Sequence, residues 1–278
     1  MLTPDTLQRC MPRAPRAACE VYAPAIAAAA VEFDLTDPHR LAAALASGAN
    51  ESGQLTKFEE VSWIGTDWRR ARGMFRHCPS QHDYEAWKAL GQAEFDRRFF
   101  DAVYGPMMGN QGQGYKYRGL GWGQLTGHDN CKAVGEFINV DLVGNPELMR
   151  DDPVIGTRAF FGYLKLNHIT DPAVSGTEAG FLESVRRSNP GLDPAIFRTH
   201  HLKRWHEVRR GLGITGGGVD VAALQRALMA AGFDLPQYGA DGDLGLETRT
   251  ALQAFQRANG LPVTGAPDSA TVKALGLS

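Results

Sequence analysis

Apolar residues recur at helical spacing in the stretch before residue 51, and this pattern predicts a helix that ends there. Asp37 is a favourable N-cap, and Pro38 fits the first helical position. The stripe then runs through Leu41, Leu45 and Gly48. One more step of three residues reaches Glu51, so its carboxyl group is expected on the core-facing side, where poor solvation raises its pKa. A carboxyl group that keeps its proton is what a general acid needs.

A second acidic residue, Glu60, follows nine positions after Glu51. Gly53 and a short extended run separate them, so Glu60 is expected to project from a different element. Two carboxyl groups in unlike environments can divide acid and base roles on a glycosidic bond. The alternative for the pair alone is two solvated surface glutamates.

The C-terminal part of the chain has a helical pattern of its own. Apolar positions predict three short helices. The first carries Val221, Leu224 and Leu228, the second carries Ala251, Leu252 and Phe255, and the third carries Val272 and Leu275 and has Asp268 as its N-cap. Turn residues at 241–242 and 260–262 separate them. The glycine-rich residues 211–218 before this part have the composition of a flexible linker.

Residues 109–127 combine seven glycines with aromatic and amide side chains. Glycines permit tight turns and close approach of the backbone. Tyr115, Tyr117 and Trp122 offer flat faces of the kind that stack on sugar rings, so we expect a carbohydrate cleft. A glycine-rich surface loop with a few packed aromatic residues is the alternative.

Several motifs, in this order, resemble family 19 glycoside hydrolases of the phage endolysin type. They are Glu51-Ser52-Gly53 with Glu60, Val103-Tyr104-Gly105, Met108-Gly109-Asn110, Tyr117-Arg118-Gly119, Gln124-Leu125-Thr126, Asp141-Leu142-Val143 and Asn145-Pro146-Glu147-Leu148. The resemblance covers roughly residues 20–210. It implies a mainly α, lysozyme-like fold with a deep cleft between two helical lobes.

The resemblance also implies roles for residues in this cleft. Glu51 would protonate the leaving oxygen, Glu60 would act as base on a water molecule at the opposite face of the sugar, and Thr126 would help hold that water. Such an inverting reaction requires the carboxyl groups to stand about 6.5–9.5 Å apart. Glu59 adjoins Glu60, and only one of them can face the cleft if the segment is extended. The nine-residue spacing favours Glu60, with Glu59 solvated.

Substrate-binding positions follow from the same resemblance. They are Gln124, Asn130, Tyr117, Arg118 and Asn189. The chain departs from the family pattern at Asn50, where a histidine is common, at Gln54, where a glycine is common, and in the segment Asn189-Pro190-Gly191. Because Pro190 fixes a backbone angle, Asn189 is expected to sit differently than in the family pattern.

The C-terminal part resembles the three-helix peptidoglycan-binding domain. The resemblance is carried by Leu224-Gln225-Arg226-Ala227-Leu228, by 241–245, by Thr248-Arg249-Thr250-Ala251-Leu252 and by 255–261. It implies a wall-anchoring role, although a purely structural appendage is an alternative. The expected organisation is a catalytic domain at 1–210, a linker at 211–218 and a peptidoglycan-binding domain at 219–278.

Composition excludes several classes of function. The net charge is −2, and four of the 29 basic and six of the 31 acidic residues lie after residue 212, so nucleic acid is not expected as a partner. Cys10, Cys19, Cys78 and Cys131 form no disulfide framework and no nucleophile motif, and free thiols are expected. The eight histidines form no metal-binding pattern, so we expect no metal and no cofactor.

The N-terminal region does not resemble a signal peptide, because the apolar residues 25–31 follow a proline and continue into acidic residues without a cleavage-like site. No segment approaches the length of a membrane span. We therefore expect synthesis in a bacterial cytoplasm, holin-type release and action on the periplasmic wall as a monomer.

The sequence thus predicts a modular endolysin that hydrolyses β-1,4 bonds of the peptidoglycan backbone. A chitinase is an alternative, because chitin shares the β-1,4-linked N-acetylated sugars, but a peptidoglycan-binding module would serve a chitinase poorly. A non-catalytic glycan-binding protein and a toxin secreted against competing bacteria are further alternatives.

Overall fold

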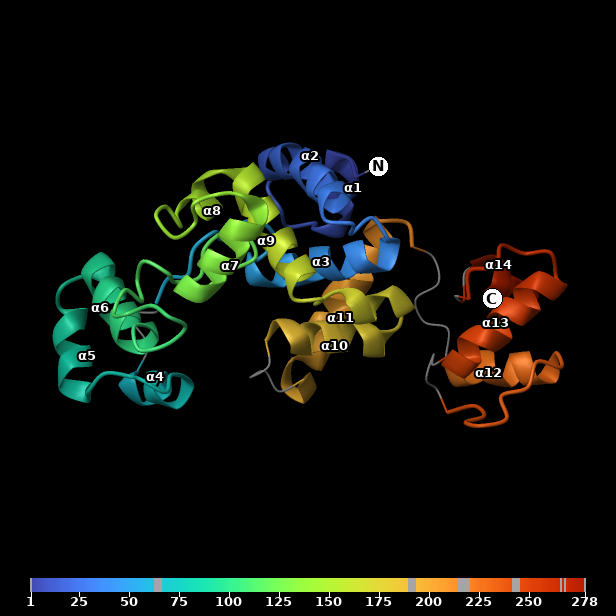
Figure 1. The fold of residues 1–278 in the computed structure, drawn as a ribbon. Helices are drawn as coiled ribbons and strands as arrows, with labels where there is room; N and C mark the ends of the chain where they lie inside the picture. Colours follow the sequence, from blue (N-terminus) through green and yellow to red (C-terminus); the bar gives the residue numbers. More distant parts are fainter. Residues whose placement is uncertain are drawn as a thin grey trace.

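The computed structural model confirms the predicted mainly α fold (Figure 1). It describes residues 2–62, 67–189, 194–214, 221–241, 246–265, 267 and 269–277. Within these residues, the β-structure consists of isolated bridges between Glu59 and Leu120 and between Leu120 and Leu125.

The main lobe is built around one large apolar core. Its helices are α1 (Pro4–Cys10), α2 (Arg16–Glu32), α3 (Pro38–Glu51), α7 (His128–Ile138), α8 (Leu148–Asp151), α9 (Pro153–Leu166), η1 (Asp171–Ser175), α10 (Glu178–Ser188) and α11 (Pro194–Gly211). Helix α3 packs against α11, α10 and η1, while α2 packs against α9. The core therefore surrounds the helix that the sequence placed before Glu51.

Helix α3 begins and ends as its sequence pattern predicts. The Asp37 side chain accepts hydrogen bonds from the backbone N–H groups of His39 and Arg40, and Pro38 occupies the first turn. Leu45 is fully buried. A Cβ atom on Gly48 would lie 2.1 Å from the Trp122 ring, so glycine is needed for the close packing of this ring on α3.

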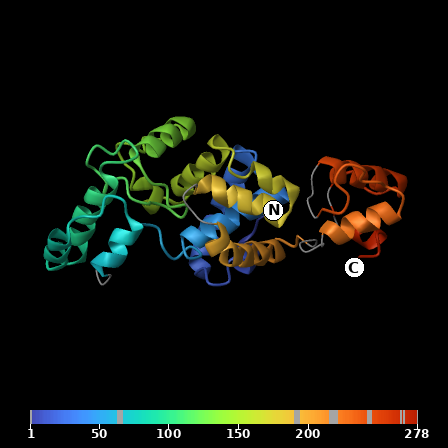
Figure 2. The same cartoon turned by 90° about the horizontal axis from the view of Figure 1, so that it is seen from below.

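A second lobe contains α4 (Trp68–Met74), α5 (Gln81–Lys88) and α6 (Gln92–Tyr104). Its separate core includes Tyr84, Phe95, Phe99 and Phe100, whose rings pack edge to face or in stacks. Figure 2 shows these three helices as a group beside the main lobe. The predicted two-lobed helical arrangement is therefore present in the described residues.

The C-terminal part forms a small core of its own from α12 (Val221–Ala230), α13 (Leu246–Ala258) and α14 (Ser269–Ala274). Two buried glutamine side chains join its elements. Gln225 donates hydrogen bonds to Asp241 and to Thr248 on α13, and Gln256 donates to Thr271 on α14. The predicted helix faces are confirmed, while the expected cap at Asp268 and the turn residues 242–245 lie outside the described residues.

The main lobe continues beyond residue 210. Helix α11 runs to Gly211, and Leu212 and Ile214 pack against the core of the main lobe. The first part of the expected linker is thus packed against the main lobe. Its remainder, residues 215–218, lies outside the described residues.

Among the described helices, none combines the length and apolar character required to cross a lipid bilayer.

Candidate active site

Glu51 is the last residue of α3, and the turn after it is fixed by Ser52. The Ser52 hydroxyl donates to the Gly48 carbonyl at 2.7 Å and accepts from the Leu55 N–H at 2.9 Å, while its side chain is fully buried. The Gln54 side chain accepts from the backbone N–H of Arg13 at 2.9 Å, which ties the same turn to the N-terminal segment. These contacts hold Glu51 in place without using its own carboxyl group.

The Glu51 carboxyl group forms no hydrogen bond or ion pair with the residues that the structure describes. Glu51 is exposed, so the expected core-facing position was wrong, although neighbouring protein still partly desolvates its carboxyl group. Desolvation and, to a smaller extent, the charge of Glu60 raise its pKa. The position of Glu51 at the C-terminal end of α3 also disfavours a negative charge. The predicted direction of this pKa shift is confirmed.

Glu60 is positioned by a short antiparallel pairing between residues 58–60 and 119–121. The Glu60 N–H donates to the Gly119 carbonyl at 2.7 Å, and the Gly121 N–H donates to the Phe58 carbonyl at 2.8 Å. Leu120 forms a second antiparallel bridge with Leu125. Glu60 thus projects from a different element than Glu51, as its sequence context predicts.

The Glu60 carboxylate has two hydrogen-bond donors. The Tyr104 hydroxyl donates to Oε1 at 2.8 Å, and the Gly119 N–H donates to Oε2 at 3.1 Å. Desolvation raises the pKa of Glu60, while these two donors and the charge of Arg118 oppose the increase. The donors favour the ionised form that a general base requires.

Glu59 faces two arginines. Its Oε2 accepts from Arg118 at 2.5 Å and from Arg150 at 3.0 Å. Desolvation alone would raise the pKa of Glu59, but the hydrogen bonds and charges of both arginines outweigh it, and the pKa is lowered. Successive side chains of an extended segment point to opposite sides, which separates Glu59 from Glu60. The expectation that Glu59 is merely solvated was therefore incomplete, because this carboxylate is tied into an ion-pair network.

The glycine-rich segment approaches Glu60 closely at Gly119. A Cβ atom on Gly119 would lie 2.7 Å from Gln124 Oε1 and 3.3 Å from Glu60 Oε2, so the absence of a side chain lets these groups gather. Gln124 donates to the Gly121 carbonyl at 2.8 Å, and the Thr126 hydroxyl donates to the Gln124 carbonyl at 3.0 Å. Asn130 donates to the Thr126 carbonyl at 2.8 Å. Gln124, Thr126 and Asn130 therefore form one connected chain next to the base.

Other predicted contacts lie inside the protein. Tyr117 is only 3% exposed and donates to the Val143 carbonyl, and Trp122 is fully buried against Phe160. The expectation that these two rings stack on sugar was wrong, because long-range packing covers both faces. Tyr115 is half-buried, and the guanidinium group of Arg118 lies 4.2 Å from its ring centroid.

Arg118 also differs from the expected picture, while a substrate-binding role of Asn189 stays a prediction. Arg118 is only 3% exposed, and its side chain is occupied by Glu59 and by the Tyr115 carbonyl. Its buried guanidinium thus supports the segment that carries Glu60, and direct contact with sugar was the wrong expectation. Asn189 is exposed at the C-terminal end of α10, and the Pro190-Gly191 part of its motif lies outside the described residues.

The sequence reasoning did not assign a role to Tyr104 or His201. Tyr104 stands in the motif Val103-Tyr104-Gly105, but only the fold shows that its hydroxyl donates to Glu60. His201 on α11 lies 2.9 Å from the amide nitrogen of Asn50, the residue before Glu51, and burial lowers the pKa of His201. The contact joins residues 151 positions apart, so no local signal could have revealed it.

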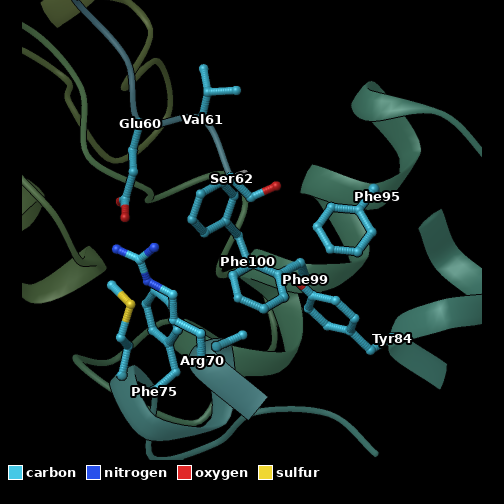
Figure 3. Close-up of a pocket in the computed structure, with 11 residues that line it drawn as sticks. Glu60, Val61, Ser62, Arg70, Phe75, Tyr84, Phe95, Phe99 and Phe100 are labelled. Carbon is cyan, nitrogen blue, oxygen red and sulfur yellow. The ribbon is translucent and has the colours of Figure 1, made fainter. Parts of the chain in front are cut away.

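A cavity of about 290 Å³ opens beside Glu60 (Figure 3). Phe75, Phe99 and Phe100 of the second lobe form much of its wall. The exposed Arg70 lines the same cavity. Glu60 is therefore bordered on one side by the glycine-rich segment and on the other by an apolar surface.

The other candidate chemistries have no support in the described residues. All four cysteines there are free thiols, and burial raises the pKa values of Cys10 and Cys131 to about 12, which keeps both protonated. No group of histidine, cysteine and acidic side chains with the arrangement of a metal site occurs in the part of the chain that the structure describes.

Comparison with known proteins gives matches over short stretches of this chain. Over 58 residues, 21% of this chain, the sequence is 52% identical to N-acetylmuramoyl-L-alanine amidase CwlL of Bacillus licheniformis. Over 38 residues, 14% of this chain, it is 53% identical to the type VI secretion system spike protein VgrG3 of Vibrio cholerae. These stretches span 16% and 4% of the respective relatives.

Over 78% of each chain, the structure is similar to that of chitinase C from Streptomyces griseus, with 20% sequence identity and a TM-score of 0.49. At this level the likeness indicates neither activity nor substrate. The family model that matches is the putative peptidoglycan binding domain, over residues 217–275.

Proposed function

We propose that this protein is a bacterial cell-wall hydrolase that cuts the β-1,4-linked glycan backbone of peptidoglycan, with Glu51 as general acid and Glu60 as general base. The observation that carries the proposal is the contrast between these carboxyl groups. Burial raises the pKa of both groups, but Glu51 has no hydrogen-bond partner among the described residues, while Glu60 accepts from Tyr104 and Gly119, which oppose the increase. One group is suited to hold a proton and the other to accept one.

The proposed reaction is a single displacement with inversion. Glu51 donates its proton to the leaving glycosidic oxygen as the bond to the anomeric carbon breaks. A water molecule attacks that carbon from the opposite face and transfers a proton to Glu60. Exchange with solvent then returns both carboxyl groups to their starting states.

The surrounding residues support the base. Tyr104 and Gly119 orient the Glu60 carboxylate, and the ion pairs of Glu59 with Arg118 fix the backbone beside it. The Thr126 hydroxyl donates to the Gln124 carbonyl, which leaves its oxygen free to accept a hydrogen bond from the attacking water. Gln124 and Asn130 are proposed to contact the N-acetylated sugar.

The choice of peptidoglycan over chitin rests on the C-terminal match to the peptidoglycan-binding family at 217–275. A module of this kind would raise the concentration of the catalytic domain at its insoluble polymer. Its small core is built separately from that of the main lobe, which suits an anchoring domain.

The test is digestion of purified peptidoglycan and of chitin in parallel, with new reducing ends and fragment masses as the readout. Reducing-end glycan fragments from peptidoglycan would support the proposal, and their masses would identify the bond that is cut. Activity on chitin alone would make the protein a chitinase, and inactivity on both polymers would favour a glycan-binding protein.

A further inference from the structure

The cavity beside Glu60 combines an apolar wall with a cation that forms no ion pair with the described residues. Phe75, Phe99 and Phe100 contribute the wall, and Arg70 lines the same space. Figure 3 shows the Arg70 guanidinium group pointing towards the Glu60 carboxylate. Among the described residues Arg70 forms no ion pair, so the space between it and Glu60 is open to a ligand.

Arg70 belongs to a cluster of cations that is not neutralised. Its members are the exposed side chains of Arg69, Arg70, Arg72 and Arg76. None of them forms an ion pair with a residue that the structure describes. Several other exposed arginines do so, as Arg16 with Asp5 and Arg97 with Glu94 show, although Arg9, Arg13 and Arg210 do not. The edge of the second lobe therefore carries an uncompensated positive charge although the whole chain is slightly acidic, with a net charge of −2.

The cation cluster continues from the cavity into a neighbouring one. A second cavity, of about 460 Å³, is lined by Arg72 and Arg76, and it shares Met74 and Phe75 with the first. Met74 is 66% exposed, an unusual position for a large apolar side chain. The two cavities therefore adjoin along α4, with Arg70 lining the one beside Glu60 and Arg72 and Arg76 lining the other.

We propose that these two adjoining cavities bind the lactyl-peptide substituent of N-acetylmuramic acid. They are here named the Arg70 pocket, which is defined by Arg70, Arg72, Met74, Phe75 and Arg76. The inference rests on the proposed function, because it assigns an orientation to the substrate of the same site. The lactyl and alanyl methyl groups would contact Met74 and Phe75. The free carboxylates of the stem peptide would pair with the arginines, whose planar guanidinium groups suit carboxylates.

The chemistry of the pocket favours this ligand over a bare sugar chain. Chitin is uncharged and has only an acetamido methyl group to offer, so it would leave the cations unpaired. The stem peptide combines small apolar groups with carboxylates spaced along an extended chain. This pattern matches the two cavities along α4, which have both apolar side chains and arginines in their walls. The pocket would thus make the catalytic domain itself selective for peptide-bearing glycan.

The test compares Arg70→Gln with the wild type on two polymers made from one wall preparation freed of teichoic acids. One is peptidoglycan with its stem peptides, and the other is the same glycan after an amidase has removed them. We expect the ratio of kcat/KM on the peptide-bearing polymer to that on the bare glycan to fall at least about 10-fold in the variant, as for a lost charge-assisted hydrogen bond. Arg70→Lys should recover part of the ratio, because lysine keeps the positive charge but lacks the planar guanidinium group that pairs with a carboxylate through two hydrogen bonds.

Arg69→Gln is the matched control, because Arg69 has the same charge and exposure but lines neither cavity. An unchanged ratio in Arg70→Gln, or an equal drop in Arg69→Gln, would overturn the pocket while leaving the hydrolase assignment intact. A wild type that cuts neither polymer would instead overturn the proposed function, so the two failures are distinguishable.

Discussion

Replacing Glu51 by Gln removes the proposed proton donor while keeping the shape of the side chain. General acid catalysis contributes about 10²–10⁴ in rate, and we expect kcat on peptidoglycan to fall by this factor. No nearby carboxyl group can take over, because Glu60 is held by Tyr104 and Gly119 and Glu59 is held by arginines. The loss should therefore lie towards the upper end of the range.

The same substitution should not destabilise the fold. Glu51 forms no hydrogen bond or ion pair with the described residues, so no stabilising contact is lost. Its pKa is raised in the folded state, so the folded protein binds this proton more tightly than the unfolded chain does. The wild type therefore loses stability as the pH rises through the folded pKa, and the variant does not. The variant should be as stable as the wild type in acid and slightly more stable at neutral pH.

Two measurements on the same preparations separate catalysis from folding. The release of reducing ends gives kcat, and thermal unfolding followed at several pH values gives relative stability. A rate loss below about 10-fold would place the proton donor elsewhere. A large rate loss together with a lower Tm at every pH would show that Glu51 supports the fold, which would refute the reasoning from its unpaired carboxyl group.

Three further changes test the site and the domains. Tyr104→Phe removes a hydrogen-bond donor that lowers the pKa of Glu60. The acidic limb of the plot of kcat against pH should therefore move to higher pH, and the rate at low pH should fall. An unmoved limb would show that Tyr104 does not influence the proposed base. Glu59→Gln weakens the pairing of the buried Arg118 and should cost about 1–3 kcal/mol in denaturant unfolding, whereas unchanged stability would contradict a structural role. Truncation of residues 215–278 should preserve cleavage of soluble glycan fragments and weaken co-sedimentation with insoluble walls; retained wall binding would contradict anchoring.

Local signals were sufficient to predict α3 and its terminal carboxyl group. The capping of α3 by Asp37, the burial of Leu45 and the position of Glu51 at the last turn depend on residues within one helix. The separation of Glu59 from Glu60 follows in the same way from the alternation of an extended segment, and the structure gives the two carboxylates different partners.

The aromatic residues of the glycine-rich segment could not be placed by such reasoning. In the sequence Trp122 stands between two glycines, which suggested that its ring was available to stack on sugar. Its burial depends on Gly48 in α3 and Phe160 in α9, which leave a space that only a large ring fills. Burial of this kind is decided by residues far apart in the chain, which a single sequence does not pair.

The position of Glu60 explains why the long-range contacts matter for chemistry as well as packing. Trp122 anchors the glycine-rich segment to α3, and the same segment supplies the Gly119 N–H to Glu60. Glu51 stands at the end of the helix on which Trp122 packs, so one packing contact links the elements that carry the two carboxyl groups. A side chain at Gly48 would displace the ring and with it the backbone that orients the base. The glycine-rich segment therefore connects the elements that carry Glu51 and Glu60, the proposed acid and base, and Trp122 anchors it to α3.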